Sequence, residues 1–513
     1  MKNFTRYGCY LVLALALADA GGARADVRLP ALFSDNMVLQ RDARVPVWGW
    51  ADEGEAVTVA FRGEEVSATA EAGKWKVWLS PGAAGGPFEM AVSGKNAITV
   101  ANILVGENWL CGGQSNMAMA LDRTAGAGEA IAAAKYPEIR LFKVKINGAD
   151  IPLDDVEGAW EVCTPETAAA FSAVGYYFGR DLHQHLNVPV GLIQACMGGT
   201  NASCWTPHAT LAGTPELESI LAEYQEAVEA YPEAKVRYEA AREAHAARMA
   251  QARADGVELP PAERQAPREP MGPEHVKRPG ALYNGMIAPL QPFAVRGAIW
   301  YQGEANARTP ATAEQYRTLF PAMIGDWRTG WGQDRFPFLF VQLAAYADNP
   351  AWPLLRDAQA AALALPHTGM AVAIDVGDKG DVHPKDKATV GARLMRAARD
   401  AAYGEDLVAF GPRFHELEIR DGLAMVYFRY SQNGLKSSAR PLTGFWIAGS
   451  DGVFVPAEAG IAGPNVIVQS EQVPNPVAVR YGWQAFPDPP CTLYNYEGLP
   501  AEPFRTDEFP LGE

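Results

Sequence analysis

Residues 103–117 read ILVGENWLCGGQSNM. The mostly apolar part up to Cys111 predicts a buried strand, and Ala118-Met119-Ala120-Leu121 has helix-forming composition. The glycine-flanked turn between them would present the Ser115 hydroxyl at the edge of a sheet, beside the N–H groups of a helix N-terminus. A turn of this kind displays a serine nucleophile, but a serine before a helix is also an ordinary N-cap. Both interpretations stay open on this segment alone.

The first 25 residues have the pattern of a signal peptide. A basic start is followed by the apolar run 10–18, and Ala23-Arg24-Ala25 offers the small residues that a signal peptidase reads. The apolar run is too short to span a bilayer, and no later segment is long enough. We therefore expect an exported, soluble protein without a membrane span, periplasmic or secreted from a bacterium.

The charge of the chain disfavours two classes of partner. The formal net charge of −16 becomes −18 without the first 25 residues, because Lys2, Arg6 and Arg24 leave together with Asp19. An acidic protein is a poor partner for nucleic acid and for anionic membranes, whereas a neutral sugar is unaffected. The remaining chain is too long for one typical domain, so we expect two or three.

The cysteines do not predict a metal or redox site. An odd number remains after the signal peptide, so at least one is unpaired unless it bonds between chains: Cys111, Cys163, Cys196, Cys204 and Cys491. The absence of a C-x-x-C pair gives no support for zinc or redox chemistry. Cys111 is near Ser115, but its place in an apolar strand predicts a packed structural thiol. We expect no metal and no cofactor.

The hydrophobic pattern divides the chain into regions. Residues 26–100 predict a β-sandwich-like domain, with alternating strands at 45–50, 57–61 and 75–79. Residues 101–404 predict an α/β domain with a parallel sheet, because strand-like and helix-like segments alternate. Its strand-like segments after the first are 191–196, 297–301, 338–343 and 371–375.

Two further parts complete the predicted organisation. Residues 214–278 are rich in Ala, Glu, Arg and Lys and then in Pro, which predicts a solvated helical insertion in the α/β domain. Residues 405–513 contain the strand-like segments 423–428, 465–469 and 477–481, which predict a C-terminal β-region.

Three segments besides the Ser115 turn follow predicted strands, where ligands bind in parallel sheets. Met197-Gly198-Gly199-Thr200 could bring backbone N–H groups to an oxyanion, although it could also be a plain turn. Residues 300–306 carry amide side chains that can donate to an oxyanion. The same segment contains Glu304, which could be an acid–base group, but we favour an ion pair with a nearby cation. His383 lies among acidic residues, as the general base of a serine triad would. A calcium loop fits this acidic spacing poorly.

In combination these segments resemble the sialate O-acetylesterase family of SGNH hydrolases. The resemblance covers nearly all of the chain after the signal peptide and is carried by residues 113–117, 198–200, 300–306 and 381–384 at the site and by 32–40, 282–286, 493–495 and 503–507 elsewhere. It implies an α/β fold with an SGNH-hydrolase-like three-layer domain and flanking all-β regions.

The resemblance also implies a catalytic triad. Ser115 is the nucleophile, His383 is the general base and Asp381 is its partner. Many SGNH enzymes space the acid and the histidine by two residues, whereas only Val382 intervenes here. Asp378 and Asp375 therefore remain alternative partners.

The implied oxyanion hole combines backbone and side-chain donors. The resemblance assigns to it the N–H of Ser115, a glycine N–H from Gly198 or Gly199, and an amide side chain. In related sugar acetylesterases this amide is a glutamine, so the resemblance favours Gln302 over Asn306.

The implied activity is that of a metal-independent serine esterase that removes O-acetyl groups from sugars, most like a sialate O-acetylesterase. Acetylated xylan or xylo-oligosaccharides are an alternative substrate for an exported bacterial enzyme. A hypothesis of another class is a non-catalytic glycan-binding protein with a vestigial site. Hydrolysis of a chromogenic acetyl ester, and its inhibition by a serine-directed reagent, would separate the two classes.

Overall fold

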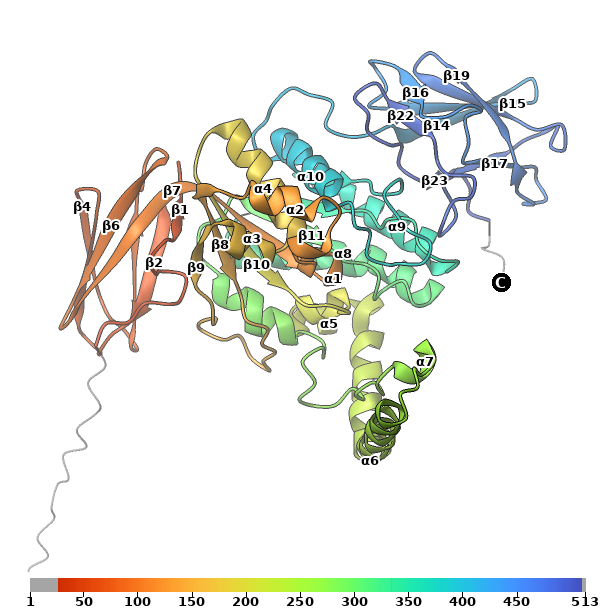
Figure 1. The fold of residues 1–513 in the computed structure, drawn as a ribbon. Coiled ribbons are helices and arrows are strands. Elements are labelled where there is room, and N and C mark those ends of the chain that lie inside the picture. Colours follow the sequence, from red (N-terminus) through yellow and green to blue (C-terminus); the bar gives the residue numbers. More distant parts are fainter. Residues whose placement is uncertain (1–25, 334, 510–513) are drawn as a thin grey trace, which may run out of the picture.

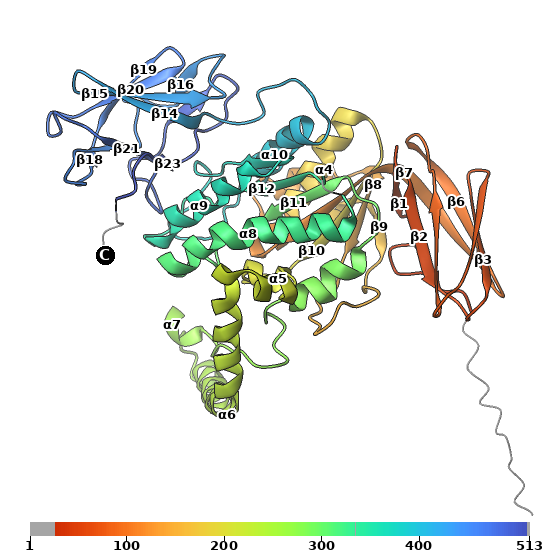
Figure 2. The same cartoon turned by 180° about the vertical axis from the view of Figure 1, so that it is seen from behind.

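The structure is a computed structural model that describes residues 26–333 and 335–509. An α/β unit lies in the middle, and two all-β units lie at its opposite ends (Figure 1). The turned view in Figure 2 shows the same order from behind. The predicted signal peptide, residues 1–25, lies outside the described residues.

The N-terminal β unit has two layers. A two-stranded sheet, β2 and β5, packs on a larger sheet that contains β3, β4 and β6. The strands of this unit are β1 (Val38–Gln40), β2 (Val45–Trp50), β3 (Ala56–Phe61), β4 (Glu64–Thr69), β5 (Lys74–Leu79), β6 (Gly85–Ser93) and β7 (Ala97–Gly113). In β5 the side chains alternate between exposed and buried, as the sequence pattern predicts for a strand with one face in a core.

Strand β7 belongs to two units at once. Its first part pairs with β6, and its last residues, Trp109–Gly113, pair with strands of the central sheet. The predicted domain boundary at residue 100 therefore lies inside this 17-residue strand. A continuous backbone ladder joins the N-terminal β unit to the α/β unit.

The central sheet has the order β13-β12-β11-β7-β10-β8-β9, and only the β8–β9 pair is antiparallel. Its strands besides β7 are β8 (Tyr136–Lys143), β9 (Trp160–Cys163), β10 (Val190–Cys196), β11 (Gly297–Tyr301), β12 (Phe338–Val341) and β13 (Thr368–Ala371). The segments between these strands form α1 (Ser115–Ala118), η1 (Leu121–Arg123), α2 (Ala127–Ala132), α3 (Pro165–Ala169), α4 (Ala173–Leu186), η2 (Ala202–Trp205), α5 (His208–Gly213), η3 (Pro215–Leu217), α6 (Glu218–Ala254), α7 (Pro261–Arg264), η4 (Tyr283–Ile287), η5 (Ala288–Leu290), α8 (Pro310–Trp331), α9 (Ala351–Ala361) and η6 (Ala362–Ala364), and α10 (Lys387–Ala401) follows the last strand.

Helices cover both faces of this sheet. On one face, Phe178 of α4 packs edge-on against Trp109 of β7, with ring centroids 5.0 Å apart, and α10 lies beside α4. On the other face, Trp327 of α8 packs edge-on against Trp300 of β11 at 5.5 Å. The central strands are buried on both sides, which explains their nearly continuous apolar sequences.

One predicted strand was misplaced. Residues 371–375 were expected to form a strand that ends in a carboxylate, but β13 is Thr368–Ala371 and the chain turns after Ala371. Residues 371–374 are nevertheless buried. A run of apolar residues predicts burial, but it does not distinguish a buried strand from a buried loop.

The segment 214–278 contains the projecting helix α6 at the bottom of Figure 2. None of the described side chains in its 37 residues is buried, which agrees with its charged composition. No helix in the described part of the chain combines the length and the apolar character needed to cross a membrane.

The C-terminal β unit is tied to the α/β unit by a buried arginine. Its strands are β14 (Arg413–Arg420), β15 (Leu423–Arg429), β16 (Leu435–Ser437), β17 (Phe445–Ala448), β18 (Val455–Pro456), β19 (Glu458–Ala462), β20 (Asn465–Gln469), β21 (Ala478–Tyr481), β22 (Leu493–Asn495) and β23 (Phe504–Arg505). Arg356 of α9 donates to the carbonyl oxygens of Leu343 and Ala344 on one side and of Gln484 and Ala485 on the other, at 2.7–2.8 Å.

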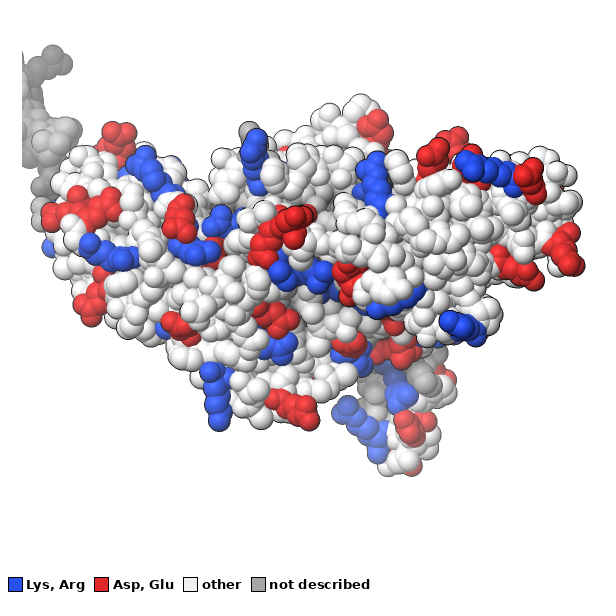
Figure 3. All heavy atoms as spheres, turned by 90° about the horizontal axis from the view of Figure 1, so that it is seen from above, with Lys and Arg blue, Asp and Glu red and all other residues white. Residues whose placement is uncertain are grey.

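The surface mixes charges of both signs. Figure 3 shows Lys and Arg interspersed with Asp and Glu on the face seen from above. Lys145 and Glu157 form one exposed pair of opposite charge, with Nζ and Oε2 2.6 Å apart. The excess of acidic residues is thus distributed rather than gathered in one segment of this face.

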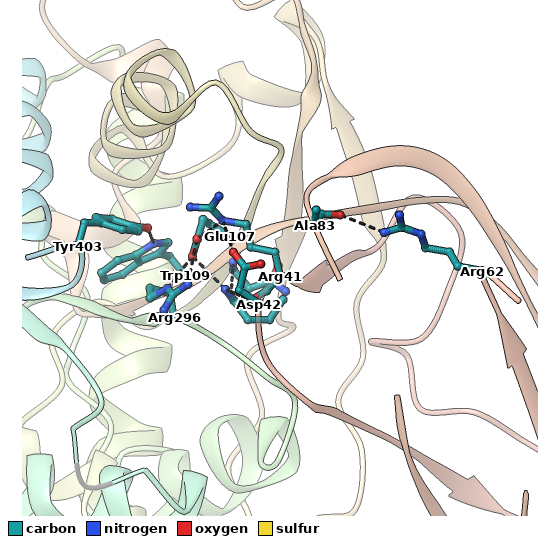
Figure 4. Close-up of polar contacts among 10 residues, drawn as sticks. Arg41, Asp42, Arg62, Ala83, Glu107, Trp109, Arg296 and Tyr403 are labelled. Atoms are coloured by element: carbon teal, nitrogen blue, oxygen red, sulfur yellow. Dashed lines mark hydrogen bonds and ion pairs between the residues drawn. The ribbon is translucent and has the colours of Figure 1, made fainter. Parts of the chain in front are cut away.

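A buried ion cluster lies where β7 passes from the N-terminal β unit into the α/β unit (Figure 4). The Glu107 carboxylate is fully buried and accepts hydrogen bonds from Arg41 at 2.6 Å, from Arg296 at 2.8 and 3.1 Å, and from Gln40 at 3.0 Å. Burial alone would raise the pKa of Glu107, but the donors around it hold that pKa below its ordinary value. Arg41 follows β1 and Arg296 precedes β11, so one carboxylate joins three parts of the chain.

Candidate active site

The four predicted site segments follow the carboxyl ends of neighbouring strands. Gly113, the last residue of β7, is paired with Cys196 at the end of β10 and with Tyr301 at the end of β11. The loop that carries His383 follows β13 at the same edge of the sheet. The structure therefore brings Ser115, Gly198, Gln302 and His383 to one edge, as the positions of their segments after the strands predicted.

The turn before Ser115 requires glycine. Gly113 has a φ of +138°, and a Cβ atom there would lie 2.2 Å from the carbonyl oxygen of Tyr301. Only glycine tolerates both the backbone angle and the close approach of the neighbouring strand. The chain then reverses sharply, and Ser115 becomes the first residue of α1.

Ser115 and His383 are in direct contact. The distance between Ser115 Oγ and His383 Nε2 is 2.8 Å, although 268 positions separate them in the sequence. Burial lowers the pKa of His383 below its ordinary value, which favours the neutral imidazole. With the ring proton on Nδ1, Nε2 is the acceptor for the Ser115 hydroxyl, as a general base requires.

Asp381 is the carboxylate beside His383. Its Oδ1 atom lies 3.4 Å from His383 Nδ1 and accepts the backbone N–H of His383 at 2.9 Å. That backbone hydrogen bond, with help from Lys385 at 3.1 Å, lowers the pKa of Asp381 and keeps it ionised. The short spacing through Val382 works because the same carboxylate holds both the ring and the backbone of the histidine.

The two alternative carboxylates have other partners. Asp375 is held by two hydrogen bonds from Arg393, at 2.6 and 2.7 Å, and by the hydroxyl of Tyr494 at 3.0 Å. Asp378 accepts the backbone N–H groups of Gly380 and Asp381 within its own loop. The geometry thus favours Asp381 as the residue that orients His383.

Backbone N–H groups next to Ser115 are free to bind an anion. A Cβ atom on Gly198 would lie 3.4 Å from Ser115 Cβ, so this glycine turn directly faces Ser115. Within the described residues, no hydrogen bond uses the N–H of Ser115, Gly198 or Gly199. The carbonyl oxygen of Gly199 accepts from Lys277 Nζ at 3.1 Å. The donors of the predicted oxyanion hole are therefore available.

The two candidate amides differ in what they bind. Gln302 is fully buried, and its Nε2 donates to the Thr200 carbonyl oxygen at 2.9 Å and to Asn306 Oδ1 at 2.7 Å. The hydroxyl of Tyr316 donates to Gln302 Oε1 at 3.0 Å. Asn306 Oδ1 also accepts the backbone N–H of Ala202, which orients its amide and leaves Nδ2 without an acceptor among the described residues. Asn306, and not Gln302, has a free donor.

Asn116 and Lys387 were not identified from the sequence. Asn116 Nδ2 donates to Glu304 Oε1 and to the carbonyl oxygen of Val382, while Lys387 Nζ donates to Asn116 Oδ1. Glu304 was expected to pair with a cation; no ion pair joins it to a cation in the described residues, and Asn116 stands between it and Lys387. The only feature of the sequence that could have pointed to Asn116 as a site residue is its position next to Ser115.

The cysteines lie in the interior of the protein. All five described cysteines are buried and free, and burial raises the pKa of Cys196 to about 12. In residues 26–333 and 335–509 no three His, Cys, Asp or Glu side chains are grouped as they would be around a metal ion.

Comparison with known proteins identifies the family. A family model described as carbohydrate esterase, sialic acid-specific acetylesterase, matches residues 272–400. A sialate O-acetylesterase from Mus musculus is 31% identical, over 96% of this chain and 97% of its own length. The chain belongs to the sialate O-acetylesterase family. A sialate O-acetylesterase from Rattus norvegicus is 30% identical, with coverage of 97% of both chains.

A solved structure supports the same family. The crystal structure of a carbohydrate acetylesterase from Xanthomonas citri superposes with a TM-score of 0.79 and 38% identity, covering 94% of this chain and all of the other. The family predicted from the sequence motifs is therefore confirmed, and so is its enzyme class, a carboxylic ester hydrolase. The mixed α/β unit with additional all-β sheets is the common architecture.

Proposed function

We propose that this protein is a serine esterase that removes O-acetyl groups from sugars, with Ser115 as its nucleophile. The contact of 2.8 Å between Ser115 Oγ and His383 Nε2 carries the proposal. The helices on both faces of a parallel sheet, with this pair at its carboxyl edge, support an SGNH-type three-layer fold. The predicted signal peptide supports export to the periplasm or the medium, where glycans are accessible.

The geometry supports a double-displacement mechanism. Ser115 Oγ attacks the acetyl carbonyl carbon while His383 Nε2 takes the hydroxyl proton, which gives a tetrahedral oxyanion. The bond to the sugar oxygen breaks, and His383 returns the proton to that oxygen. A water then loses a proton to His383 and attacks the acetyl-enzyme, releasing acetate and restoring Ser115. Asp381 stabilises the imidazolium in both steps.

We propose Asn306 as the side-chain donor of the oxyanion hole. Its Nδ2 is free, whereas both donor positions of Gln302 are used inside the protein. The Asn306→Ala variant should lower kcat by about 10²–10³-fold, the usual effect of removing one oxyanion donor. Steady-state kinetics on a chromogenic acetyl ester measure this effect, with little change in KM.

Gln302→Met is the control for that experiment. It keeps the length of the side chain and removes its hydrogen bonds to Thr200, Asn306 and Tyr316. The backbone N–H of Ala202 still orients Asn306, so we expect the variant to affect mainly the stability of the fold. A collapse of kcat in Gln302→Met, with full kcat in Asn306→Ala, would assign the oxyanion hole to Gln302 instead.

We propose O-acetylated sialic acid as the substrate class. The mouse and rat relatives are sialate O-acetylesterases, and their similarity extends over nearly the whole chain. The structure adds a cation at the site, because Lys277 Nζ lies beside the glycine turn that faces Ser115. A sialic acid has a carboxylate that such a cation can bind, whereas acetylated xylo-oligosaccharides are neutral.

Replacing Lys277 tests the substrate. Lys277→Met should reduce kcat/KM for O-acetylated sialic acid about two- to fivefold, the value of one partly exposed charge pair. The same variant should leave kcat/KM for an acetylated xylo-oligosaccharide unchanged. Equal losses on both substrates, or a wild-type enzyme that strongly prefers the neutral one, would contradict the assignment.

A further inference from the structure

The Asn116 side chain lies between two buried ionisable groups. Its Oδ1 accepts from the ammonium of Lys387, and its Nδ2 donates to the Glu304 carboxylate. The oxygen of the amide therefore faces the cationic partner and its NH₂ group faces the anionic one. This orientation aligns the amide dipole with the field of the two groups, so the reversed orientation would place like partial charges together.

Lys387 is held in place by its position in the fold. It is the first residue of α10 and its side chain is fully buried, with Nζ 5.0 Å from the centre of the Tyr301 ring. Burial lowers the pKa of Lys387 to about 7, and it raises the pKa of Glu304. Two neighbours offset this effect of burial, because Asn116 Oδ1 accepts from Nζ and the face of the Tyr301 ring lies against it.

The second N–H of Asn116 reaches the histidine loop. Asn116 Nδ2 donates to the carbonyl oxygen of Val382 at 2.9 Å, and Val382 precedes His383. Asn116 itself follows Ser115. One amide thus links the residue next to the nucleophile with the residue next to the base.

We propose that Lys387 and Glu304 lock the orientation of Asn116, and that Asn116 in turn holds the His383 loop against Ser115. The three are positioning residues for the Ser115–His383 hydrogen bond. This inference rests on the proposed function, in which Ser115 and His383 are the reacting pair.

The amide is required at position 116 because it both accepts and donates. Asn116→Asp keeps an acceptor for Lys387 but loses both donors and brings a carboxylate to Glu304. Lys387→Met keeps most of the side-chain volume but removes the donor that orients the amide. Glu304→Gln keeps an acceptor oxygen for Asn116, so it is the conservative variant that should rescue the arrangement.

The main experiment measures kcat and KM on a chromogenic acetyl ester. Asn116→Asp should lower kcat about 10²-fold with a KM within about threefold of the wild type, because a displaced general base slows the chemical step and leaves binding intact. Lys387→Met should lower kcat about 10- to 10²-fold, and Glu304→Gln should stay within about threefold of the wild type.

The pH profile gives a readout that a merely structural role would not move. The charges that act on His383 are Asp381, which raises its pKa, and Lys387 and Lys385, which lower it. Removing Lys387 therefore raises the pKa of His383. Because the base must be neutral to accept a proton, the acidic limb of kcat/KM should move to higher pH in Lys387→Met.

Arg328→Met is the matched control. Arg328 is another buried cation, but it donates to the carbonyl oxygens of Phe336 and Pro366, next to the start of β12 at the opposite edge of the sheet. It should lower the thermal midpoint without moving kcat or the pH limb. Should Lys387→Met unfold, Glu304→Leu provides a second variant that removes the acceptor for Asn116.

Labelling of Ser115 by a fluorophosphonate separates two kinds of failure. If the wild type is not labelled at Ser115, the proposed function fails. If the wild type is labelled, and folded Asn116→Asp and Lys387→Met are labelled and turn over at the wild-type rate, only the positioning role is overturned. Slower labelling of both variants, with normal labelling of Arg328→Met, supports the proposal.

Discussion

Replacing Ser115 with alanine is expected to lower kcat on a chromogenic acetyl ester by about 10⁴-fold or more, because the variant has no oxygen to form the acetyl-enzyme. The fold should be unaffected, since Ser115 Oγ contacts only His383 in the described hydrogen bonds. Purified wild type and variant are compared in steady-state kinetics, with circular dichroism as the check on folding.

Two controls make this result specific. Ser67→Ala, an exposed serine in β4, should retain full activity. A fluorophosphonate should label the wild type at Ser115 and leave Ser115→Ala unlabelled. Full turnover by Ser115→Ala would overturn the serine mechanism, and a wild type that binds acetylated glycans without hydrolysing them would favour the glycan-binding hypothesis.

The second large effect concerns stability. Glu107→Ala should lower the free energy of unfolding by about 3–5 kcal/mol, the usual result of removing one partner of a buried ion pair. The variant leaves two arginines, Arg41 and Arg296, without their shared carboxylate. It also loosens the point where the N-terminal β unit and the central sheet meet on β7. Urea unfolding followed by tryptophan fluorescence measures the loss.

The comparison for Glu107 is an exposed ion pair. Glu157→Ala breaks the pair with Lys145, in which both side chains are more than half exposed, and should change stability far less. Glu107→Gln, which keeps an acceptor but loses the charge, should fall between the two. Equal stability of Glu107→Ala and wild type would show that the cluster does not join the two units.

Local sequence patterns predicted much of the fold and part of the site. The β2 strand was placed at its observed bounds, and the Ser115 turn does follow a buried strand. These features depend on residue spacing and on glycine at Gly113, which the chain carries locally. The predicted boundary at residue 100 lies inside β7, because the pairing of β7 with two sets of strands leaves no local pattern in the sequence. The last central strand was misplaced, because residues 372–374 are buried outside a strand.

The choice between neighbouring candidates needed the folded chain. Gln302 and Asn306 are both amides after the same strand, and only their hydrogen bonds show which one keeps a free donor. The sequence alone likewise does not distinguish between three aspartates near His383, namely Asp375, Asp378 and Asp381. In the structure Arg393 binds Asp375, and a backbone N–H of the loop donates to Asp378. Such assignments depend on partners from other segments.

The sequence by itself determined the family, the order of the structural units, and the serine and histidine at the sheet edge, because motifs and periodicity are local properties. Tertiary structure alone decided which carboxylate faces His383, which amide is free, and that the buried Lys387 reaches Asn116 from 271 positions away. The reason is physical: hydrogen bonds and burial act over a few ångströms in space, and the distance along the chain does not predict them.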